Sequence, residues 1–339
     1  MTVRLRPLWP VLLALVLCLA SSAGCAPRAA QTVPPPATAP SSAAGPPSST
    51  VATTAASTGA TVTFAVIGDY GYGGKNELAV AKLVASWDPD FVITTGDDYY
   101  SPAGGIGTAK YDSSTGAYYC RWLKDVSTTG SRCRVGTAAR NAFFPSLGNH
   151  DYSDATPALD TYLTYFTLPG TGFTNTSGNE RYYDFVEGPV HFFVLNSNSG
   201  EPDGTSGSST QARWLRSQLA ASTSKWNIVY DHHPPYSSDS VHGSTGALQW
   251  PFATWGADAV ISGHAHTYER VMHDGIPYFV NGLGGAPRYA FATPVPGSAV
   301  RYRSDWGAQM ATVTSTTIQF RFYTVSGALK DEFRLTAPP

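Results

Sequence analysis

Residues 62–100, VTFAVIGDYGYGGKNELAVAKLVASWDPDFVITTGDDYY, decide the fold of this chain. Two apolar, β-branched runs within this stretch, Val62–Ile67 and Phe91–Thr95, each end abruptly at a Gly-Asp pair. Between them, apolar side chains recur at the spacing of one helical face over Asn76–Trp87, with Asn76 as the expected N-cap. A strand, a helix and a strand in this order predict a βαβ unit whose two strands are parallel and adjacent.

The pattern of an apolar run that stops at polar side chains recurs three more times. The runs are Phe143–Leu147, Trp226–Tyr230 and Ala257–Ser262, and they are followed by Gly148-Asn149-His150, Asp231-His232-His233 and Gly263-His264-Ala265-His266. Open α/β sheets bind their ligands beyond the carboxyl ends of the strands. Five such ends, including those at Asp69 and Asp97, predict one shared site of carboxylates and imidazoles.

The remaining patterns predict a helix over Gln211–Leu219, a buried strand over His191–Asn196 and an antiparallel hairpin over 311–335. One large folded domain suits a chain of 339 residues with 42% hydrophobic and 14% charged residues. The formal net charge is -2 and no Lys/Arg block is present, so the composition does not support a nucleic-acid partner held through its phosphates.

The N-terminus has the pattern of an export signal. Arg4 and Arg6 precede an apolar run over Leu8–Ala20, which is too short for a transmembrane helix, and small residues follow up to Cys25. The tripeptide before Cys25 is similar to a bacterial lipobox, although Ser22 stands where leucine is usual. This similarity implies an acylated Cys25 and an exported protein that touches the membrane only through this lipid, with simple cleavage nearby or an uncleaved anchor as the alternatives.

A tether is predicted between the signal (residues 1–25) and the folded domain (residues 61–335). Residues 26–60 are almost entirely Ala, Pro, Ser and Thr, and no periodic apolar pattern is present from which a core could form. Two of the four cysteines, Cys120 and Cys133, lie outside the signal region. In an oxidising compartment this pair predicts a disulfide, and a pair of metal ligands is the alternative.

The order of the polar motifs resembles the ligand sequence of the calcineurin-like metallophosphoesterases. The motifs are Asp-x-Gly at Asp69, Gly-Asp-x-x-Tyr at 96–100, Gly-Asn-His-Asp at 148–151, a histidine at His232 and Gly-His-x-His at 263–266. The tyrosine of the second motif is similar to that of the purple acid phosphatases. The resemblance implies an α/β fold, namely a four-layer αββα sandwich, and an acid phosphatase that hydrolyses small phosphate monoesters by attack of a metal-bound hydroxide.

The same resemblance implies which side chains hold two metal ions. Asp69, Asp97, Tyr100 and His266 would bind the first ion, and Asp97, Asn149, His232 and His264 the second, so that Asp97 bridges both. A phenolate binds only to a strongly acidic ion, so Tyr100 implies Fe(III), accompanied by Fe(II), Zn or Mn. The alternative for Tyr100 is aromatic packing beneath its loop.

Three further histidines are candidates for contact with the substrate. His150 resembles the family histidine that contacts the phosphate and protonates the leaving group, and Asp151 is a candidate to orient it. His242 is a second candidate, with an exposed loop position as the alternative. His233 is a third, with a metal-ligand role in place of its neighbour His232 as the alternative. The alternative functions are a divalent-metal phosphodiesterase of the same superfamily and a non-catalytic surface lipoprotein.

Overall fold

The computed structural model describes residues 61–104, 107–124, 126–127, 138–152 and 159–337. The predicted signal, the tether, Cys25 and Cys133 lie outside these residues, so the predicted domain bounds stay predictions. All of the described residues belong to one compact unit, which lies within Thr54–Pro339. Within the described part, no helix is long and apolar enough to cross a membrane.

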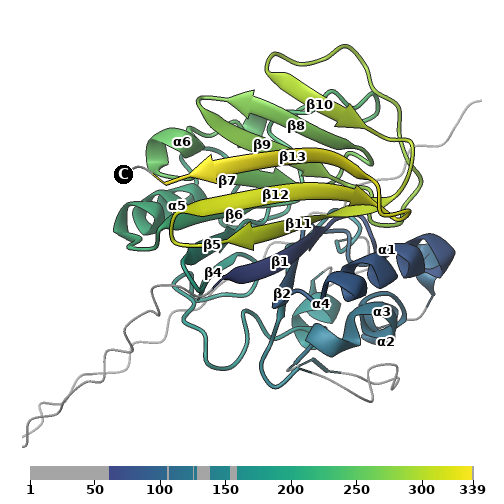
Figure 1. Ribbon diagram of the computed structural model, residues 1–339. Helices are drawn as coiled ribbons and strands as arrows, with labels where there is room; N and C mark the ends of the chain where they lie inside the picture. Colours follow the sequence, from purple (N-terminus) through teal and green to yellow (C-terminus); the bar gives the residue numbers. More distant parts are fainter. Residues whose placement is uncertain (1–60, 105–106, 125, 128–137, 153–158, 338–339) are drawn as a thin grey trace, which may run out of the picture. The chain divides into compact units, whose positions relative to one another are not determined.

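Two mixed β-sheets lie face to face at the centre of the described fold (Figure 1). Among the described residues, the first sheet has six strands in the order β13 (Leu329–Thr336), β12 (Thr317–Thr324), β11 (Gly307–Val313), β1 (Val62–Ile67), β2 (Phe91–Thr94) and β3 (Phe143–Pro145). The second has seven described strands in the order β10 (Ser298–Tyr302), β8 (Tyr268–His273), β9 (Ile276–Asn281), β7 (Ala259–Ser262), β6 (Trp226–Tyr230), β5 (Val190–Val194) and β4 (Tyr183–Glu187).

Helices cover the outer faces of both sheets. α1 (Gly74–Trp87) lies outside the first sheet together with the short helices α2 (Ala109–Tyr111), α3 (Ala117–Tyr119) and α4 (Asp160–Tyr165), and α5 (Thr210–Ala221) and α6 (Phe252–Trp255) lie outside the second (Figure 1). α1 buries Val80 and Val84, and α5 buries Leu215 and Leu219. The four layers confirm the predicted αββα sandwich.

The strand pairing brings five carboxyl ends to the same region. β1 pairs with β2 in parallel, which confirms the predicted βαβ unit, and β2 pairs in parallel with β3. In the second sheet, β5, β6 and β7 are parallel neighbours. The residues that follow β1, β2, β3, β6 and β7 are the ones that carry the polar motifs.

The core between the two sheets is aromatic. Phe64 stacks on its neighbour Phe91 with ring centroids 5.3 Å apart, and it meets Phe192 of the second sheet edge-on at 5.2 Å. All three rings are buried, and burial of one phenylalanine side chain stabilises a fold by about 1.5–3 kcal/mol. This layer fixes the two sheets relative to each other and therefore the two halves of the site.

The first helix begins earlier than predicted. Its N-cap is Gly73, with φ at 76°, and the assignment of the cap to Asn76 was wrong. Glu77 gives the physical reason, because its Oε2 accepts a hydrogen bond from the N–H of Gly73 at 2.7 Å and satisfies a donor at the start of the helix. α5 also extends beyond the predicted range, since Ser209 caps it by accepting a hydrogen bond from the N–H of Ala212 at 3.1 Å.

The predicted C-terminal hairpin is confirmed as β12 and β13, which are antiparallel. Sequence reasoning missed that β11 is a separate strand. β11 pairs with β12 on one side and lies antiparallel to β1 on the other. The C-terminal strands thereby complete the sheet that carries Asp69 and Asp97.

Candidate metal centre

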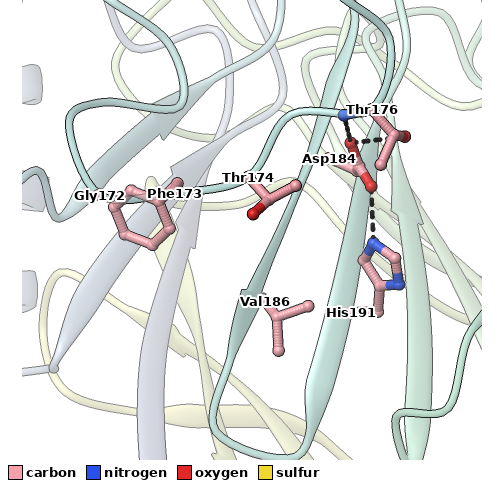
Figure 2. A pocket seen from close by; sticks show the side chains of 7 residues that line it. All are labelled: Gly172, Phe173, Thr174, Thr176, Asp184, Val186 and His191. Carbon is pink, nitrogen blue, oxygen red and sulfur yellow. Dashed lines mark hydrogen bonds and ion pairs between the residues drawn. The ribbon is translucent and has the colours of Figure 1, made fainter. Parts of the chain in front are cut away.

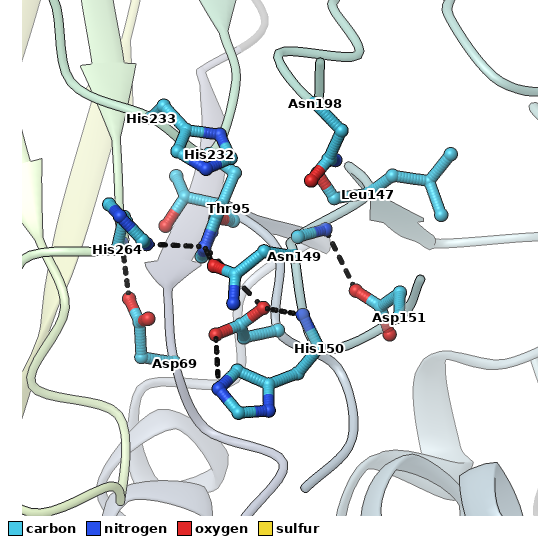
Figure 3. A network of polar contacts seen from close by, with 12 residues as sticks. Asp69, Thr95, Leu147, Asn149, His150, Asp151, Asn198, His232, His233 and His264 are labelled. Atoms are coloured by element: carbon cyan, nitrogen blue, oxygen red, sulfur yellow. Dashed lines mark hydrogen bonds and ion pairs between the residues drawn. The ribbon is translucent and has the colours of Figure 1, made fainter. Parts of the chain in front are cut away.

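Polar side chains from five strand ends converge on one point. Asp69, Asp97 and Asn149 follow β1, β2 and β3 of the first sheet, and His232 and His264 follow β6 and β7 of the second. Figure 3 shows the imidazoles and the Asn149 amide turned toward one another beside the carboxylates. The first sheet thus supplies the carboxylates and the amide, and the second supplies imidazoles.

The backbone at three of these residues adopts a conformation that side-chain-bearing residues rarely take. Asp69, Asp97 and His264 have φ values of 55°, 55° and 65°. This left-handed conformation costs about 1–2 kcal/mol per residue and concentrates where function requires it. The N–H of His264 donates to Oδ2 of Asp69 at 2.8 Å, so the strained turns of the two sheets are bonded to each other.

Two glycines of the motifs leave room for neighbouring carboxylates. A Cβ atom on Gly148 would lie 2.1 Å from Oδ1 of Asp97, and one on Gly263 would lie 2.7 Å from Oδ2 of Asp69. Real Cβ atoms do not approach other atoms this closely. The glycines at these two positions are therefore explained by close approach of the backbone to a carboxylate of another strand.

One cluster of donor atoms surrounds the hydroxyl of Tyr100. The Tyr100 Oη lies 2.6 Å from Oδ2 of Asp97, 3.1 Å from Oδ1 of Asp69 and 3.1 Å from Nε2 of His266. The His266 Nε2 is itself 3.2 Å from Oδ1 of Asp69. The structure brings together all four residues predicted for the first ion.

A second cluster surrounds Nε2 of His232. This atom lies 3.0 Å from Oδ1 of Asn149, 3.4 Å from Oδ1 of Asp97 and 3.2 Å from Nδ1 of His264. These are the four residues predicted for the second ion. Asp97 takes part in both clusters, with Oδ2 facing Tyr100 and Oδ1 facing His232.

Backbone carbonyls orient two of the imidazoles. Nδ1 of His232 is bonded to the carbonyl of Thr95 at 2.7 Å, and Nδ1 of His266 to the carbonyl of Pro287 at 2.6 Å. A proton held on Nδ1 leaves the lone pair of Nε2 directed at the cluster. Hydrogen bonds of this kind are the usual support of metal-binding histidines.

Without bound cations, the surroundings of Asp97 and Tyr100 disfavour their ionised forms. Burial raises the pKa of Asp97 well above its ordinary value, and the nearby charge of Asp69 adds to the effect. Burial followed by the charge of Asp97 likewise raises the pKa of Tyr100. Burial lowers the pKa of His232, which favours the neutral imidazole that a metal needs.

His266 differs, because the charge of Asp69 and a hydrogen bond to it outweigh burial and raise its pKa. The carboxylates of Asp69 and Asp97 pair with no lysine or arginine among the described residues, only with histidines. Donor atoms of Asp69, Asp97 and His232 lie within 4.8 Å of one another. Buried oxygen and nitrogen donors without a cationic side chain fit bound cations, which would favour the ionised forms of the carboxylates and the phenol.

His150 lies at the edge of the first cluster. Its ring is 4.2 Å from that of Tyr100, its Nε2 is 4.0 Å from Oδ2 of Asp97, and its side chain is 43% exposed. Its backbone N–H donates to Oδ1 of Asp97 at 2.9 Å. Burial lowers the pKa of His150. The imidazole of His150 is thus beside the carboxylate of Asp97 and open to solvent.

His233 and His242 both lie against His264. Ring centroids are 4.3 Å apart for His233 and 3.8 Å for His242. Nδ1 of His233 is bonded to Oγ of Ser197 at 2.7 Å. His232 rather than His233 faces Asp97, although donor atoms of His232, His233 and His264 also lie close enough to one another to form a metal-binding group.

Asp151 does not have the role that its sequence position suggested. Its Oδ2 accepts hydrogen bonds from the N–H groups of Gly148 at 2.8 Å and Asp98 at 3.4 Å, and its Oδ1 accepts one from Tyr111 at 3.1 Å. Burial raises its pKa to about 6. Asp151 therefore ties together the loops that follow β2 and β3, beneath the ligands, rather than orienting His150.

Sequence reasoning missed two residues of the site. Tyr289 stacks on His266 with ring centroids 4.1 Å apart and an interplanar angle of 8°. Ser197 contacts His233 twice. Its Oγ is hydrogen-bonded to Nδ1 of the His233 ring, and it accepts a hydrogen bond from the backbone N–H of His233 at 2.9 Å. Neither lies in a motif, because Tyr289 is in an irregular segment and Ser197 is at the start of a Gly/Ser-rich loop.

Other residues singled out from the sequence lie elsewhere. Cys120 begins a short 3-10 turn and Cys133 is outside the described residues, so the disulfide stays a prediction. His191 lines a separate cavity of about 300 Å³ at strands β4 and β5, where its Nε2 is 2.8 Å from Oδ2 of Asp184 (Figure 2). That cavity is lined by Gly172, Phe173, Thr174, Thr176, Asp184, Val186 and His191 and shares no residue with the candidate centre.

Relatives with known names share sequence with most of the described chain. Purple acid phosphatase 17 of Arabidopsis thaliana is 24% identical over 303 residues, which cover 81% of this chain and 84% of that protein. Tartrate-resistant acid phosphatase type 5 of Mus musculus is 24% identical over 287 residues, which cover 71% of this chain and 79% of that protein. Purple acid phosphatase 15 of Arabidopsis thaliana is 26% identical, and the match covers 61% of this chain but 40% of that protein.

Solved structures agree on the fold. Purple acid phosphatase PPD1 from yellow lupin, Lupinus luteus, superposes with a TM-score of 0.64 at 17% identity, over 82% of this chain and 54% of that one. GAP50, the anchor in the inner membrane complex of Plasmodium, superposes with a TM-score of 0.60 at 17% identity, over 82% of this chain and 90% of that one. The family model for calcineurin-like phosphoesterases matches residues 62–268, which is more than half of the sequence and includes every residue of the two donor clusters. This chain therefore belongs to the calcineurin-like phosphoesterase family.

Proposed function

We propose that this protein is a dinuclear-metal acid phosphatase that hydrolyses phosphate monoesters. The observation that carries the proposal is the position of Asp97. Its two carboxylate oxygens face two different donor clusters, one around Tyr100 and one around His232. A single carboxylate between two clusters is the arrangement that two neighbouring cations require. The low-identity purple acid phosphatase relatives support the same activity.

The chemistry of the donors distinguishes the two ion sites. Asp69, Asp97, Tyr100 and His266 would hold Fe(III), because a buried phenol becomes a ligand only for a strongly acidic ion. Asp97, Asn149, His232 and His264 offer neutral donors and one shared carboxylate, which suit Fe(II), Zn or Mn. A pair of cations held by these residues would supply an ionised water as nucleophile and positive charge for the phosphoryl oxygens.

The three histidines at the edge of the centre would bind and protonate the substrate. The rings of His233 and His242 both contact the ring of His264, and their N–H groups would bind the phosphate oxygens. His150 is half-exposed beside Asp97 and is in position to give a proton to the leaving oxygen as a general acid. Asp151 holds the loop that carries His150 through the N–H of Gly148.

A divalent-metal phosphodiesterase is the second candidate. It would need no phenolate, whereas the hydroxyl of Tyr100 lies 3.1 Å from both Oδ1 of Asp69 and Nε2 of His266. The monoesterase is therefore the better proposal. Comparison of para-nitrophenyl phosphate with bis(para-nitrophenyl) phosphate separates the two activities directly.

The test uses the purified full chain and its native metal content. We expect hydrolysis of para-nitrophenyl phosphate that exceeds hydrolysis of the diester, is lost on chelation and returns with added iron and zinc. Asp97→Asn and His264→Ala should each lower kcat by about 100-fold or more. Asp160→Asn and His273→Ala, at residues outside both clusters, should not. Turnover by metal-depleted protein, or a preference for the diester, would overturn the proposal.

We also propose that the protein is exported and anchored through a lipid on Cys25. The support is the sequence of the first 25 residues, with two arginines, an apolar run and small residues before the cysteine. Cys25→Ala should move the protein from the membrane fraction to the soluble fraction. A wild-type protein whose purified N-terminus begins at another residue would contradict the lipid anchor.

A further inference from the structure

A basic pocket includes Arg288, on a segment whose neighbouring residues contact the candidate metal centre. It has a volume of about 370 Å³ and is lined by Arg288, Arg303, Ser304 and Trp306. None of these residues belongs to a sequence motif or to the donor clusters. The pocket is polar and open, with two guanidinium groups on its walls, so it is suited to a charged ligand.

The segment that carries Arg288 is bonded to two metal-binding residues. The N–H of Ala286 donates to the carbonyl of Asp69 at 3.0 Å. The carbonyl of Pro287 accepts from Nδ1 of His266 at 2.6 Å, and the N–H of Tyr289 donates to the carbonyl of His266 at 3.1 Å. Arg288 lies between these contacts, with its Cα about 3.8 Å from those of its neighbours.

The far wall of the pocket is fixed to the same segment. Nε1 of Trp306 donates to the carbonyl of Ala286 at 2.9 Å, and the guanidinium of Arg288 lies 4.2 Å from the centre of the Trp306 ring. Arg288 also donates to the carbonyl of Arg303 at 3.4 Å. The pocket and the metal centre are therefore held in one relative position by direct bonds.

Within the described part of the chain, no carboxylate forms an ion pair with either arginine of this pocket. Arginine–carboxylate ion pairs among the described residues involve Arg121, Arg140, Arg181, Arg270 and Arg321. Arg288 and Arg303 are not among them. Residues 286–304 contain three arginines and no acidic residue, in a chain whose net charge is -2, and the next carboxylate, Asp305, accepts the backbone N–H of Trp306.

We propose that Arg288 and Arg303 bind a second anionic group of the substrate while the metal centre holds the phosphate that is cleaved. The inference rests on the proposed phosphatase function and narrows its substrate class. The preferred esters would carry a further phosphate or carboxylate on the leaving group. Arginine forks bind both groups through paired, charge-assisted hydrogen bonds, and Ser304 adds a donor.

Matched substrates test this pocket. The wild-type protein should hydrolyse 1,4-butanediol bisphosphate and 4-phosphonooxybutyrate with a higher kcat/KM than butyl phosphate, which has the same chain but no second anion. In the Arg288→Gln/Arg303→Gln double variant, the KM for the bisphosphate should rise about tenfold and the preference should fall by the same factor. The two anionic substrates distinguish a phosphate preference from a carboxylate preference.

Arg301→Gln is the matched control. Arg301 lies in the same segment, but its guanidinium contacts Phe291 and the carbonyl of Ala292 rather than the pocket. We expect this variant to keep the preference for the second anion. If Arg301→Gln lost the preference for the second anion to the same extent, the effect would be one of overall charge, and the proposal that the pocket binds this anion would be refuted.

Calorimetric binding of butane-1,4-bisphosphonate and butylphosphonate separates this inference from the phosphatase proposal, because neither compound requires turnover. Tighter binding of the bisphosphonate than of butylphosphonate to the wild-type protein, with the difference reduced in the double variant, would support the proposed anion site. This holds even if no ester is hydrolysed, because absence of hydrolysis would refute only the phosphatase proposal. Equal affinities for the two compounds, or a preference that survives in the double variant, would refute the pocket whatever the activity.

Discussion

The hydroxyl oxygen of Tyr100 lies 2.6 Å from Oδ2 of Asp97, and both side chains are buried. This is the distance of a strong hydrogen bond between a hydroxyl and a carboxylate. Burial raises the pKa of both groups, so in the protein alone they retain a proton between them. A cation at this position would displace that proton and turn both oxygens into ligands.

The first prediction concerns Tyr100→Phe. Removal of the phenol oxygen should abolish any visible charge-transfer band and weaken retention of the first ion, because the phenolate is the donor specific to Fe(III). Absorption spectra and metal content of the purified variant measure both effects. Tyr72→Phe is the control, since its ring contacts that of Tyr100 at 5.6 Å. An unchanged spectrum in Tyr100→Phe would show that Tyr100 only packs beneath its loop.

The second prediction concerns Gly148→Ala. The added Cβ would meet both Oδ1 and the backbone nitrogen of Asp97, at 2.1 and 2.2 Å, so the bridging carboxylate or its loop must move. We expect a loss of stability of about 1–3 kcal/mol and loss of the second metal ion. Thermal unfolding and metal analysis test this. Gly246→Ala, where a Cβ meets nothing within 4 Å, should be neutral in both measurements.

The third prediction concerns pH and Glu77. This carboxyl is buried, one oxygen accepts from Gly73, and the other has no hydrogen-bond partner among the described residues. Burial raises the pKa of Glu77, so the folded state holds its proton more tightly than the unfolded state. The contribution of Glu77 to stability is full below its ordinary pKa and is lost as pH rises through the folded pKa.

Glu77→Gln removes this titration. The stability of the variant relative to wild type should therefore increase from pH 4 toward pH 8, as measured by denaturant unfolding at each pH. Glu332→Gln is the control, and its stability relative to wild type should change with pH in the opposite direction, because a hydrogen bond from Arg321 lowers the pKa of the exposed Glu332. A relative stability of Glu77→Gln that is independent of pH would contradict the prediction.

The strands that carry the ligands were predictable because each is an apolar run that stops at a polar motif. β1 and β6 begin and end at the predicted residues. β8 was not predicted, since it contains Glu269 and Arg270 in place of an apolar run. In the fold, Glu269 is buried and accepts hydrogen bonds from the N–H of Ser238 at 2.6 Å and from Oγ of Ser298 at 2.6 Å. Such compensation by distant residues cannot be seen in a local pattern.

The turn between β11 and β12 was also missed, because it contains neither glycine nor proline. Thr314 makes this turn with its own side chain, whose Oγ1 accepts from the N–H groups of Thr316 at 3.2 Å and Thr317 at 3.0 Å. A threonine can thus replace the usual turn residues. The alternating pattern of apolar and polar residues continues across this turn, so the sequence predicted one strand where the structure has β11 and β12.

The donor residues were predictable from their motifs, whereas their surroundings were not. Tyr289, Ser197 and Pro287 reach the centre from irregular segments, through contacts that depend on how the two sheets lie together. Asp151 shows the reverse case. Its place in a motif suggested His150 as its partner, but its hydrogen bonds go to the N–H of Gly148 and to Asp98 and Tyr111 on other segments.

The bond between the N–H of His264 and the carboxylate of Asp69 joins residues 195 positions apart. A growing chain that stops before β7 has both candidate ligand aspartates, Asp69 and Asp97, but only one of the three candidate ligand histidines, His232. The two proposed ions would therefore be bound only after one sheet has docked on the other, and an incomplete or misassembled chain would not hold both. Under the proposed function, metal content would report on complete folding, and a chain that has not finished folding would have no phosphatase activity.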